Sequence, residues 1–224
     1  MIKWNKKFEY PTSSRAEVKG TRTYDIKGEK LPSVTTVLSR TKDQEFLKKW
    51  KAKVGEQEAD RIKNHAANRG SIMHKYIEDH LEGNNHEDMT PLGQEAKLMA
   101  RKIIDVGLEP LNEIWGSEVT LMYPDLYAGS TDLVGVYNNK ETLIDFKQAN
   151  RPKVKEWIGD YFLQAGAYCM AHDYMFNTSI HQAVIMVCTP DLFYQEFRIE
   201  GTELKNYKYK FLERLDQYHE QNKQ

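Results

Sequence analysis

The chain has 224 residues, of which 40% are hydrophobic and 29% are charged, and its formal net charge is −1. This length and composition fit a single globular domain with a sizeable core. No apolar run is long enough to cross a membrane, which takes about 18 residues or more, so a membrane-spanning protein is excluded. A protein that coats duplex DNA would be more basic, so we expect any contact with nucleic acid to come from local patches.

The N-terminus and the cysteines bear on cellular location. The first eight residues, MIKWNKKF, have neither the apolar core of a signal peptide nor the pattern of a transit peptide, and the expected location is the cytoplasm. Cys169 and Cys188 lie in apolar segments, as buried thiols do. Two cysteines are too few for a four-cysteine iron–sulfur cluster.

The chain up to residue 110 is predicted to be mainly helical. Ser33 is a suitable N-cap for a helix that starts with the following valine. Apolar residues recur at helical spacing through residues 43–83, with expected breaks near Gly55 and at Arg69-Gly70-Ser71. The predicted elements are a strand at 21–26, a helix from Ser33, the helical stretch 43–83 and a helix at 94–106.

The pattern changes to strands after Pro110. The predicted elements are strands at 115–123, 127–137 and 141–148, a helix at 157–174, strands at 183–188 and 192–199, and a helix at 204–218. This order predicts one α/β domain over residues 1–224, in which a central mixed sheet is flanked by helices and preceded by a helical layer. Within it we expect a mainly helical region over residues 1–110, the sheet and a helix over residues 111–200, and a C-terminal helix over residues 201–224.

The most informative residues are two aspartates on a predicted hairpin. Asp145 and Lys147 are two apart on a strand and therefore point to the same face. A two-residue turn at Asn138-Asn139 would place Asp132 opposite Asp145, with Cβ atoms about 5 Å apart. Two facing carboxylates repel each other, and a divalent cation between them removes the conflict. Alternatively, Asp132 caps a turn, and Asp145 forms an exposed ion pair with Lys147.

These residues predict a site for Mg²⁺ or Mn²⁺, which prefer carboxylate oxygens and keep several waters. Glu118 is a third acidic candidate, because a turn at 124–126 would place it opposite Asp132; a turn of even length would rotate it away, leaving a solvated edge residue. Lys147 is expected to orient a metal-bound water and to stabilise charge on a phosphoryl oxygen.

Three further residues are unremarkable on pattern alone. His74 lies on a predicted helix, where a lone histidine is more often structural than a ligand. Gln164 and Tyr168 are four apart and share a helix face, as ordinary core neighbours do.

The order of these residues, however, resembles the PD-(D/E)xK nuclease superfamily in its RecB-like branch. The shared features are His74, Asp132, the tripeptide Asp145-Phe146-Lys147 and Gln164-x-x-x-Tyr168. The segments Leu31–Leu38 and Phe46–Trp50 are similar to the mitochondrial genome maintenance exonuclease group and its phage-encoded relatives. One departure is that Thr131 precedes Asp132, where the family name has proline.

The resemblance implies a restriction-endonuclease-like fold and metal-dependent cleavage of DNA. On that basis His74, Asp132, Asp145 and the Phe146 carbonyl would bind metal, with Glu118 as an additional acidic residue. Lys147 would be the catalytic lysine, and Gln164 and Tyr168 would support the site.

The implied substrate is DNA, and single-stranded DNA in particular, with exonuclease action in replication, repair or recombination, whose proteins are possible partners. The basic patches are lysines around Trp50 and the cations that follow the tripeptide, although such runs also occur as solvated helix faces. The residues expected to contact DNA are Trp50, Lys49, Arg69, Arg151 and Lys153. Two alternatives remain: a structure-specific or RNA-directed endonuclease, and a non-catalytic DNA-binding protein.

Overall fold

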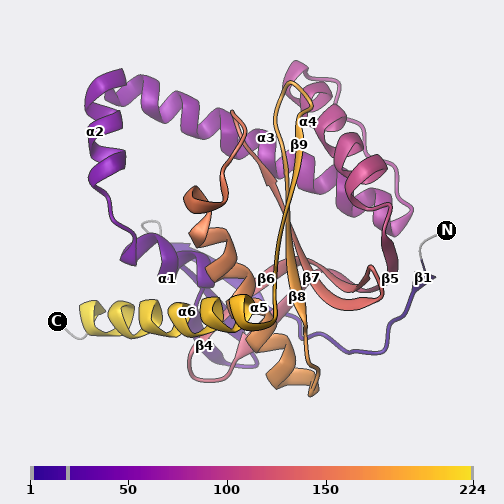
Figure 1. Ribbon diagram of the computed structural model, residues 1–224. Coiled ribbons are helices and arrows are strands. Elements are labelled where there is room, and N and C mark those ends of the chain that lie inside the picture. The colour runs from indigo at the N-terminus through magenta and orange to yellow at the C-terminus, as the bar shows by residue number, and fades with distance from the viewer. Residues whose placement is uncertain (1–2, 19–20, 223–224) are drawn as a thin grey trace.

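A six-stranded mixed sheet forms the centre of the molecule, with strand order β1-β5-β6-β7-β8-β9 (Figure 1). The computed structural model describes residues 3–18 and 21–222. Neighbouring strands are antiparallel, except that β1 is parallel to β5 and β7 is parallel to β8. The strands are β1 (Lys3–Trp4), β5 (Leu111–Tyr123), β6 (Tyr127–Tyr137), β7 (Lys140–Gln148), β8 (Gln182–Cys188) and β9 (Tyr194–Glu200).

Helices cover both faces of this sheet. One core lies between the sheet and the helices α3 and α4, and a second lies between the sheet and the helices α1, α5 and α6 (Figure 1). The expected α/β fold with a central mixed sheet flanked by helices is therefore confirmed. The helices are α1 (Val34–Thr41), α2 (Glu45–Val54), α3 (Glu56–Glu82), α4 (Pro91–Lys102), α5 (Gly159–Phe176) and α6 (Gly201–Asn222), with a π-helical turn at Ile103–Gly107 and a 3₁₀ turn at Lys155–Trp157.

Strand β7 contributes side chains to both cores, because they alternate between its two faces. Leu143 packs into the core with α5, whereas Ile144 and Phe146 pack into the core with α3 and α4. Successive residues of a strand point to opposite faces, so the middle of β7, which is covered on both sides, is apolar on both faces. Among the described helices, none combines the length and the hydropathy that crossing a membrane requires.

The β6–β7 hairpin has the predicted register. Asn138 and Asn139 have φ angles of 50° and 60°, and Tyr137 pairs with Lys140. Positive φ at both central positions is the requirement of a type I′ turn, which asparagine tolerates better than most residues.

A small antiparallel sheet precedes α1. It consists of β2 (Ser14–Val18), β3 (Thr21–Ile26) and β4 (Glu29–Pro32), in the order β2-β3-β4. Ser33 then caps α1, because its hydroxyl accepts a hydrogen bond of 2.9 Å from the backbone N–H of Thr36. The predicted strand at 21–26 and the predicted cap are confirmed, whereas β2 and β4 were not predicted.

Helix α3 differs from the prediction because it continues without a break through Arg69-Gly70-Ser71. Gly70 packs against β7, and a Cβ atom there would come within 3.2 Å of the Gln148 side chain. The glycine therefore marks a close approach between a helix and a strand. Helix α5 also starts later than predicted, at Gly159.

Candidate metal and nuclease site

The site begins where the pairing of the β6–β7 hairpin ends. The last regular pair is Leu133 with Ile144, one position before the two aspartates would face each other. Asp132 continues the ladder with its side chain, since its Oδ2 accepts a hydrogen bond of 2.6 Å from the backbone N–H of Phe146. Asp132 is only 9% exposed, so this bond fixes the carboxylate between the two strands.

Glu118 reaches the same place from β5. The turn at 124–126 has three residues, and the pairs on both sides of Glu118 keep one register, which places Glu118 opposite Asp132. Its φ angle of 50° is in the left-handed region, where a glutamate is uncommon. The side chain is exposed and accepts a long hydrogen bond of 3.4 Å from the Ser130 hydroxyl.

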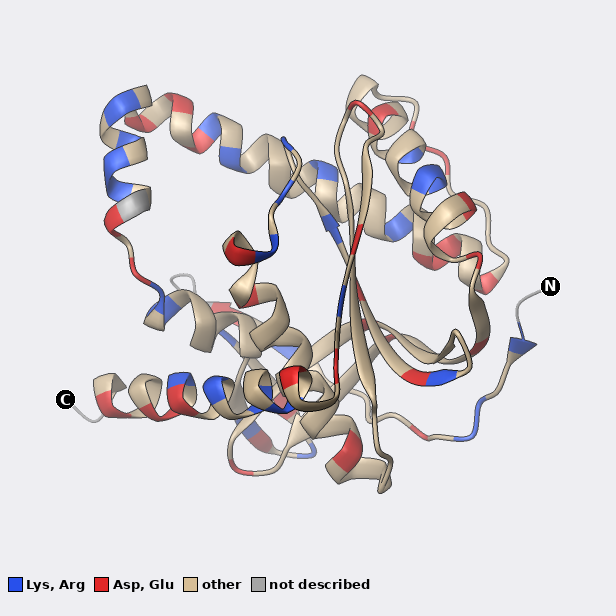
Figure 2. Cartoon of the chain, viewed as in Figure 1, with Lys and Arg blue, Asp and Glu red and all other residues tan. Residues whose placement is uncertain are grey.

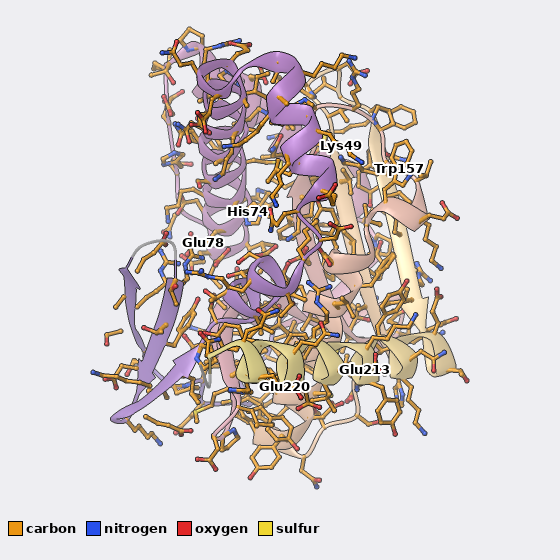
Figure 3. All side chains as sticks on the ribbon, turned by 90° about the vertical axis from the view of Figure 1, so that its left-hand side faces the viewer. Lys49, His74, Glu78, Trp157, Glu213 and Glu220 are labelled. Carbon is orange, nitrogen blue, oxygen red and sulfur yellow. The ribbon has the colours of Figure 1, made fainter. Side chains whose placement is uncertain are left out.

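His74 approaches the carboxylates from α3 (Figure 3). Its Nδ1 lies 3.4 Å from Asp132 Oδ1 and 3.8 Å from Glu118 Oε1. On the other side of the ring, Nε2 lies 2.8 Å from the carbonyl oxygen of Phe146, to which it can donate a hydrogen bond. The ring is therefore oriented by a backbone carbonyl and presents Nδ1 to two acidic groups.

These three residues form a set of possible metal ligands. One ligand atom from each of His74, Glu118 and Asp132 lies within 4.8 Å of the others. An imidazole nitrogen with two carboxylates suits a divalent cation, and a backbone carbonyl that holds the second ring nitrogen is a common support of a metal-binding histidine.

Asp145 and Lys147 form a buried pair next to this set. Asp145 is 1% exposed, and its Oδ2 lies 2.5 Å from the Lys147 ammonium nitrogen. The same oxygen has no hydrogen bond of normal geometry within the described residues. The ammonium group also lies 5.2 Å from the centre of the Tyr161 ring. Lys147 is therefore held by a carboxylate and an aromatic ring at the edge of the site.

The charges of the site shift one another's pKa. Burial alone would lower the pKa of His74, but Asp132 and Glu118 outweigh it and raise the pKa to about 10. Burial raises the pKa of Asp145 to about 6, with Asp132 adding to the effect and Lys147 opposing it. Burial would lower the pKa of Lys147, but Asp145 and Asp132 raise it above its usual value. Lys147 is therefore an ammonium ion at neutral pH.

Comparison with known proteins identifies a relative. No family model matches the chain. The mitochondrial genome maintenance exonuclease 1 of Xenopus tropicalis is 28% identical over 203 residues, which cover 84% of this chain and 57% of that protein. The resemblance to the PD-(D/E)xK nuclease superfamily is confirmed. The chain spans little more than half the length of this relative.

Solved structures of similar proteins were also found. A suspected exonuclease from Eubacterium rectale has a TM-score of 0.46 at 14% identity, covering 66% of this chain and 64% of that chain. An alkaline exonuclease from Laribacter hongkongensis has a TM-score of 0.33 at 18% identity, covering 68% of this chain and 82% of that chain.

In this chain the site opens into a cleft of about 600 Å³. Small residues of α3, among them Gly70 and Ser71, line this cleft together with His74 and Lys147. Arg15 and Arg22, which come from β2 and β3, also line it. These arginines could not be predicted as part of the cleft, because nothing in a short polar strand shows that it will pack near a distant site.

Gln164 and Tyr168 lie on α5, and Tyr168 packs into the same core as Leu143 of β7. The Gln164 amide donates a hydrogen bond of 3.4 Å to the Tyr168 hydroxyl. Tyr168 is 2% exposed and packs on Gly129 of β6, where a Cβ atom would come within 2.6 Å of its ring. Tyr168 therefore packs against the strand that carries Asp132, and Gln164 contacts the Tyr168 hydroxyl.

Four of the five residues expected to contact DNA are accessible. Lys49 and Arg151 are exposed, and Trp50 and Lys153 are half-buried. Figure 2 shows that lysine and arginine gather on α2 and on the segment that follows β7. One group therefore lies on the helix before α3, which carries His74, and the other follows β7, which carries Asp145 and Lys147.

Arg69 requires a correction, because it is only 4% exposed. Its guanidinium donates to Glu95 Oε1 at 2.6 Å and to Gln148 Oε1 at 2.7 Å, and also to the Asn150 side chain. All of these partners belong to the protein, so Arg69 joins α3, α4 and the end of β7. It does not present its charge to DNA.

Proposed function

We propose that the chain is a divalent-metal-dependent nuclease that hydrolyses phosphodiester bonds of DNA. The observation that carries the proposal is the convergence of His74, Glu118 and Asp132 within 4.8 Å, beside the buried pair of Asp145 and Lys147. A cluster of ionisable groups with strongly shifted pKa values, in a cleft large enough for a nucleotide, is typical of a catalytic site.

The residues present fit a metal ion. Three ligand atoms of suitable type converge, and the Asp145 carboxylate lies next to them, paired through Oδ2 with Lys147. We expect His74, Glu118, Asp132 and Asp145 to hold Mg²⁺ or Mn²⁺. Such an ion supplies a water of lowered pKa and shields the charge of a phosphate.

Lys147 contributes a positive charge at the place where phosphate must lie. Asp145 and Asp132 raise its pKa above the usual value, which favours the charged ammonium form. A fixed ammonium group can orient a water and donate hydrogen bonds to a phosphoryl oxygen as charge develops there. The Tyr161 ring restricts the positions open to the ammonium group.

The substrate we propose is single-stranded DNA, degraded from an end, in DNA replication, repair or recombination. The cations of α2 and of residues 151–155 can follow a sugar–phosphate backbone, and half-buried aromatic rings such as Trp50 and Tyr161 offer faces for unpaired bases. Support for action from an end comes from the similarity to a protein named as an exonuclease.

The test is cleavage of end-labelled nucleic acids by the purified protein with Mg²⁺ or Mn²⁺. The panel contains linear and circular DNA, single-stranded and double-stranded DNA, and RNA. We expect degradation of linear single-stranded DNA that EDTA abolishes. Lys147→Ala is expected to lower kcat about 10²- to 10³-fold. Lys210→Ala, a change at an exposed lysine of α6 outside the cleft, serves as the matched control.

Three outcomes would contradict the proposal. Full activity of Lys147→Ala would remove the assigned role of the lysine. Cleavage of circular substrates or of RNA in preference to linear DNA would favour an endonuclease. Binding of DNA without hydrolysis in either metal would favour a non-catalytic DNA-binding protein.

A further inference from the structure

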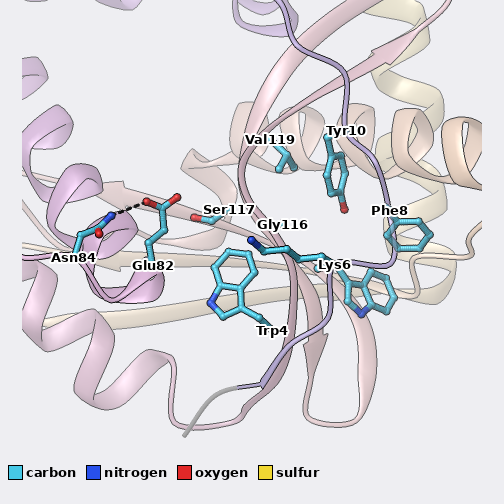
Figure 4. Close-up of a pocket in the computed structure, with 10 residues that line it drawn as sticks. Trp4, Lys6, Phe8, Tyr10, Glu82, Asn84, Gly116, Ser117 and Val119 are labelled. Carbon is cyan, nitrogen blue, oxygen red and sulfur yellow. Dashed lines mark hydrogen bonds between the residues drawn. The ribbon is translucent and has the colours of Figure 1, made fainter.

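A second cleft, of about 610 Å³, lies beside the candidate site (Figure 4). Three segments distant in sequence meet there: the N-terminal segment, the C-terminal end of α3 and the middle of β5. The lining residues are Trp4, Lys6, Phe8, Tyr10, Glu82, Asn84, Trp115, Gly116, Ser117 and Val119.

Two elements, β5 and α3, contribute residues to both clefts. On β5, Ser117 and Val119 line the second cleft, and the residue between them, Glu118, lines the first. On α3, His74 lines the first cleft and Glu82 lines the second, eight residues later. Eight residues of α-helix span about 12 Å. A DNA strand that passes the candidate metal ligands would therefore reach the second cleft within about this distance.

The walls of the second cleft combine aromatic rings with a cation. Trp4 and Phe8 are half-buried, and the Trp4 indole is fixed by a hydrogen bond of 2.8 Å from its Nε1 to the Leu81 carbonyl. Lys6 is exposed, and its ammonium lies 5.8 Å from the centre of the Trp4 ring; Figure 4 shows its side chain reaching toward Ser117. Preformed aromatic faces beside a lysine match a base and its phosphate.

Polar groups at the end of α3 complete the lining. The Glu82 carboxylate accepts a hydrogen bond of 3.0 Å from the Asn84 amide (Figure 4). The edge of a base can form hydrogen bonds with the second amide proton and the amide oxygen of Asn84, and with the Ser117 hydroxyl. An acidic group in the wall disfavours a bare phosphate but accepts the amino group of a base.

We propose that this second cleft binds a nucleotide of single-stranded DNA next to the scissile phosphate, on the side away from α2. The base stacks on the Trp4 ring, and Lys6 contacts the adjoining phosphate. The identity of the ligand rests on the proposed function, because the cleft is adjacent to the candidate metal ligands. The strand then runs from the cations of α2, across His74 and Asp132, to the Trp4 ring.

The experiment measures the binding of a short oligothymidylate in EDTA, where no hydrolysis occurs. We expect Trp4→Ala to weaken binding about tenfold, as the loss of one aromatic–base stack does, and Trp4→Phe to retain most of the affinity. We expect Lys6→Gln to reduce the slope of log Kd against log salt by about 0.7, the value for one phosphate contact of a single strand. Lys210→Gln, an exposed lysine of α6, is the matched control and should change neither.

Cross-linking locates the contact. Oligothymidylate with a photoreactive base, irradiated on the wild-type protein, is expected to label the segment that includes Trp4 and Lys6. Failure of the wild type to bind, or unchanged affinity and salt slope in both Trp4→Ala and Lys6→Gln, would overturn the inference. Because Lys6 is exposed, its replacement tests the cleft even if Trp4→Ala does not fold. Binding that depends on these residues, without any hydrolysis in metal, would reject the nuclease and retain the DNA-binding cleft.

Discussion

Asp132 accepts its backbone hydrogen bond from Phe146, the residue between Asp145 and Lys147. The carboxylate therefore has two tasks: one oxygen holds the strand that carries the acid and the lysine, and the other lies 3.4 Å from His74 Nδ1. A change at Asp132 consequently affects the positions of its neighbours as well as the charge of the site.

The variant Asp132→Asn separates the backbone hydrogen bond of Asp132 from its negative charge. The amide oxygen can still accept from the Phe146 N–H, but the negative charge is lost. We expect the protein to fold, to bind Mn²⁺ at least about tenfold more weakly, and to lose cleavage activity. Calorimetric titration with Mn²⁺ measures the affinity. Asp125→Asn, at an exposed turn position, is the control. Equal Mn²⁺ affinity in both variants would exclude Asp132 as a ligand.

The charge of His74 makes the stability of the metal-free protein depend on pH. The pKa is raised from 6.5 to about 10, so the folded state binds the proton more tightly than the unfolded state does. The resulting stabilisation is complete below about pH 6.5 and is lost as the pH rises toward about 10. We expect the Tm in EDTA to fall over this range, and to fall less in His74→Gln. Parallel Tm curves for the two proteins would show that His74 is not protonated in the folded state.

Most of the hairpin could be predicted from sequence because its determinants are local. Two adjacent asparagines between apolar strands set the length of the turn, and the length of the turn sets the register that brings Asp132 toward Asp145. The same holds for Ser33, whose capping bond spans three residues. The register of Glu118 followed from the turn at 124–126, but its positive φ angle did not.

The features that the sequence did not predict depend on contacts between segments that are distant in the chain. The local pattern predicts a helix break at Gly70, because the contact of this glycine with Gln148, far along the sequence, does not show in that pattern. It also predicts a DNA contact at Arg69, because the partners of this arginine lie on α4 and at the end of β7. The cleft around Trp4 requires the N-terminal segment to pair with β5, which no short pattern indicates.

Arg69 and Lys49 are expected to differ in effect, although both carry one positive charge. Arg69→Ala removes the partner of Glu95 and Gln148 in a buried place and should lower the free energy of unfolding by about 2 kcal/mol or more. Lys49→Gln should leave it within about 0.5 kcal/mol, because the side chain is exposed. Lys49→Gln should instead reduce the salt dependence of single-stranded DNA binding by about 0.7 in the log–log slope. Urea unfolding and a salt series measure the two effects, and an unchanged stability of Arg69→Ala would contradict the structural role.

Gly135 tests whether the packing of β5 on β6 positions Glu118. The register of β5 against β6 is irregular between Ile114 and Gly116, and a Cβ atom on Gly135 would overlap the backbone carbonyl of Glu113. A backbone carbonyl cannot rotate away as a side chain can, so β5 must shift in Gly135→Ala. We expect a loss of about 1–3 kcal/mol in the free energy of unfolding, together with weaker Mn²⁺ binding, because Glu118 lies a few residues further along the shifted strand.

The matched control for Gly135→Ala is Gly159→Ala at the start of α5. No atom lies within 4 Å of a Cβ built at Gly159, so this substitution should change stability by less than about 0.5 kcal/mol. Urea unfolding and Mn²⁺ titration of both variants give the comparison. If Gly135→Ala loses stability but binds Mn²⁺ as the wild type does, Glu118 is not positioned by this packing.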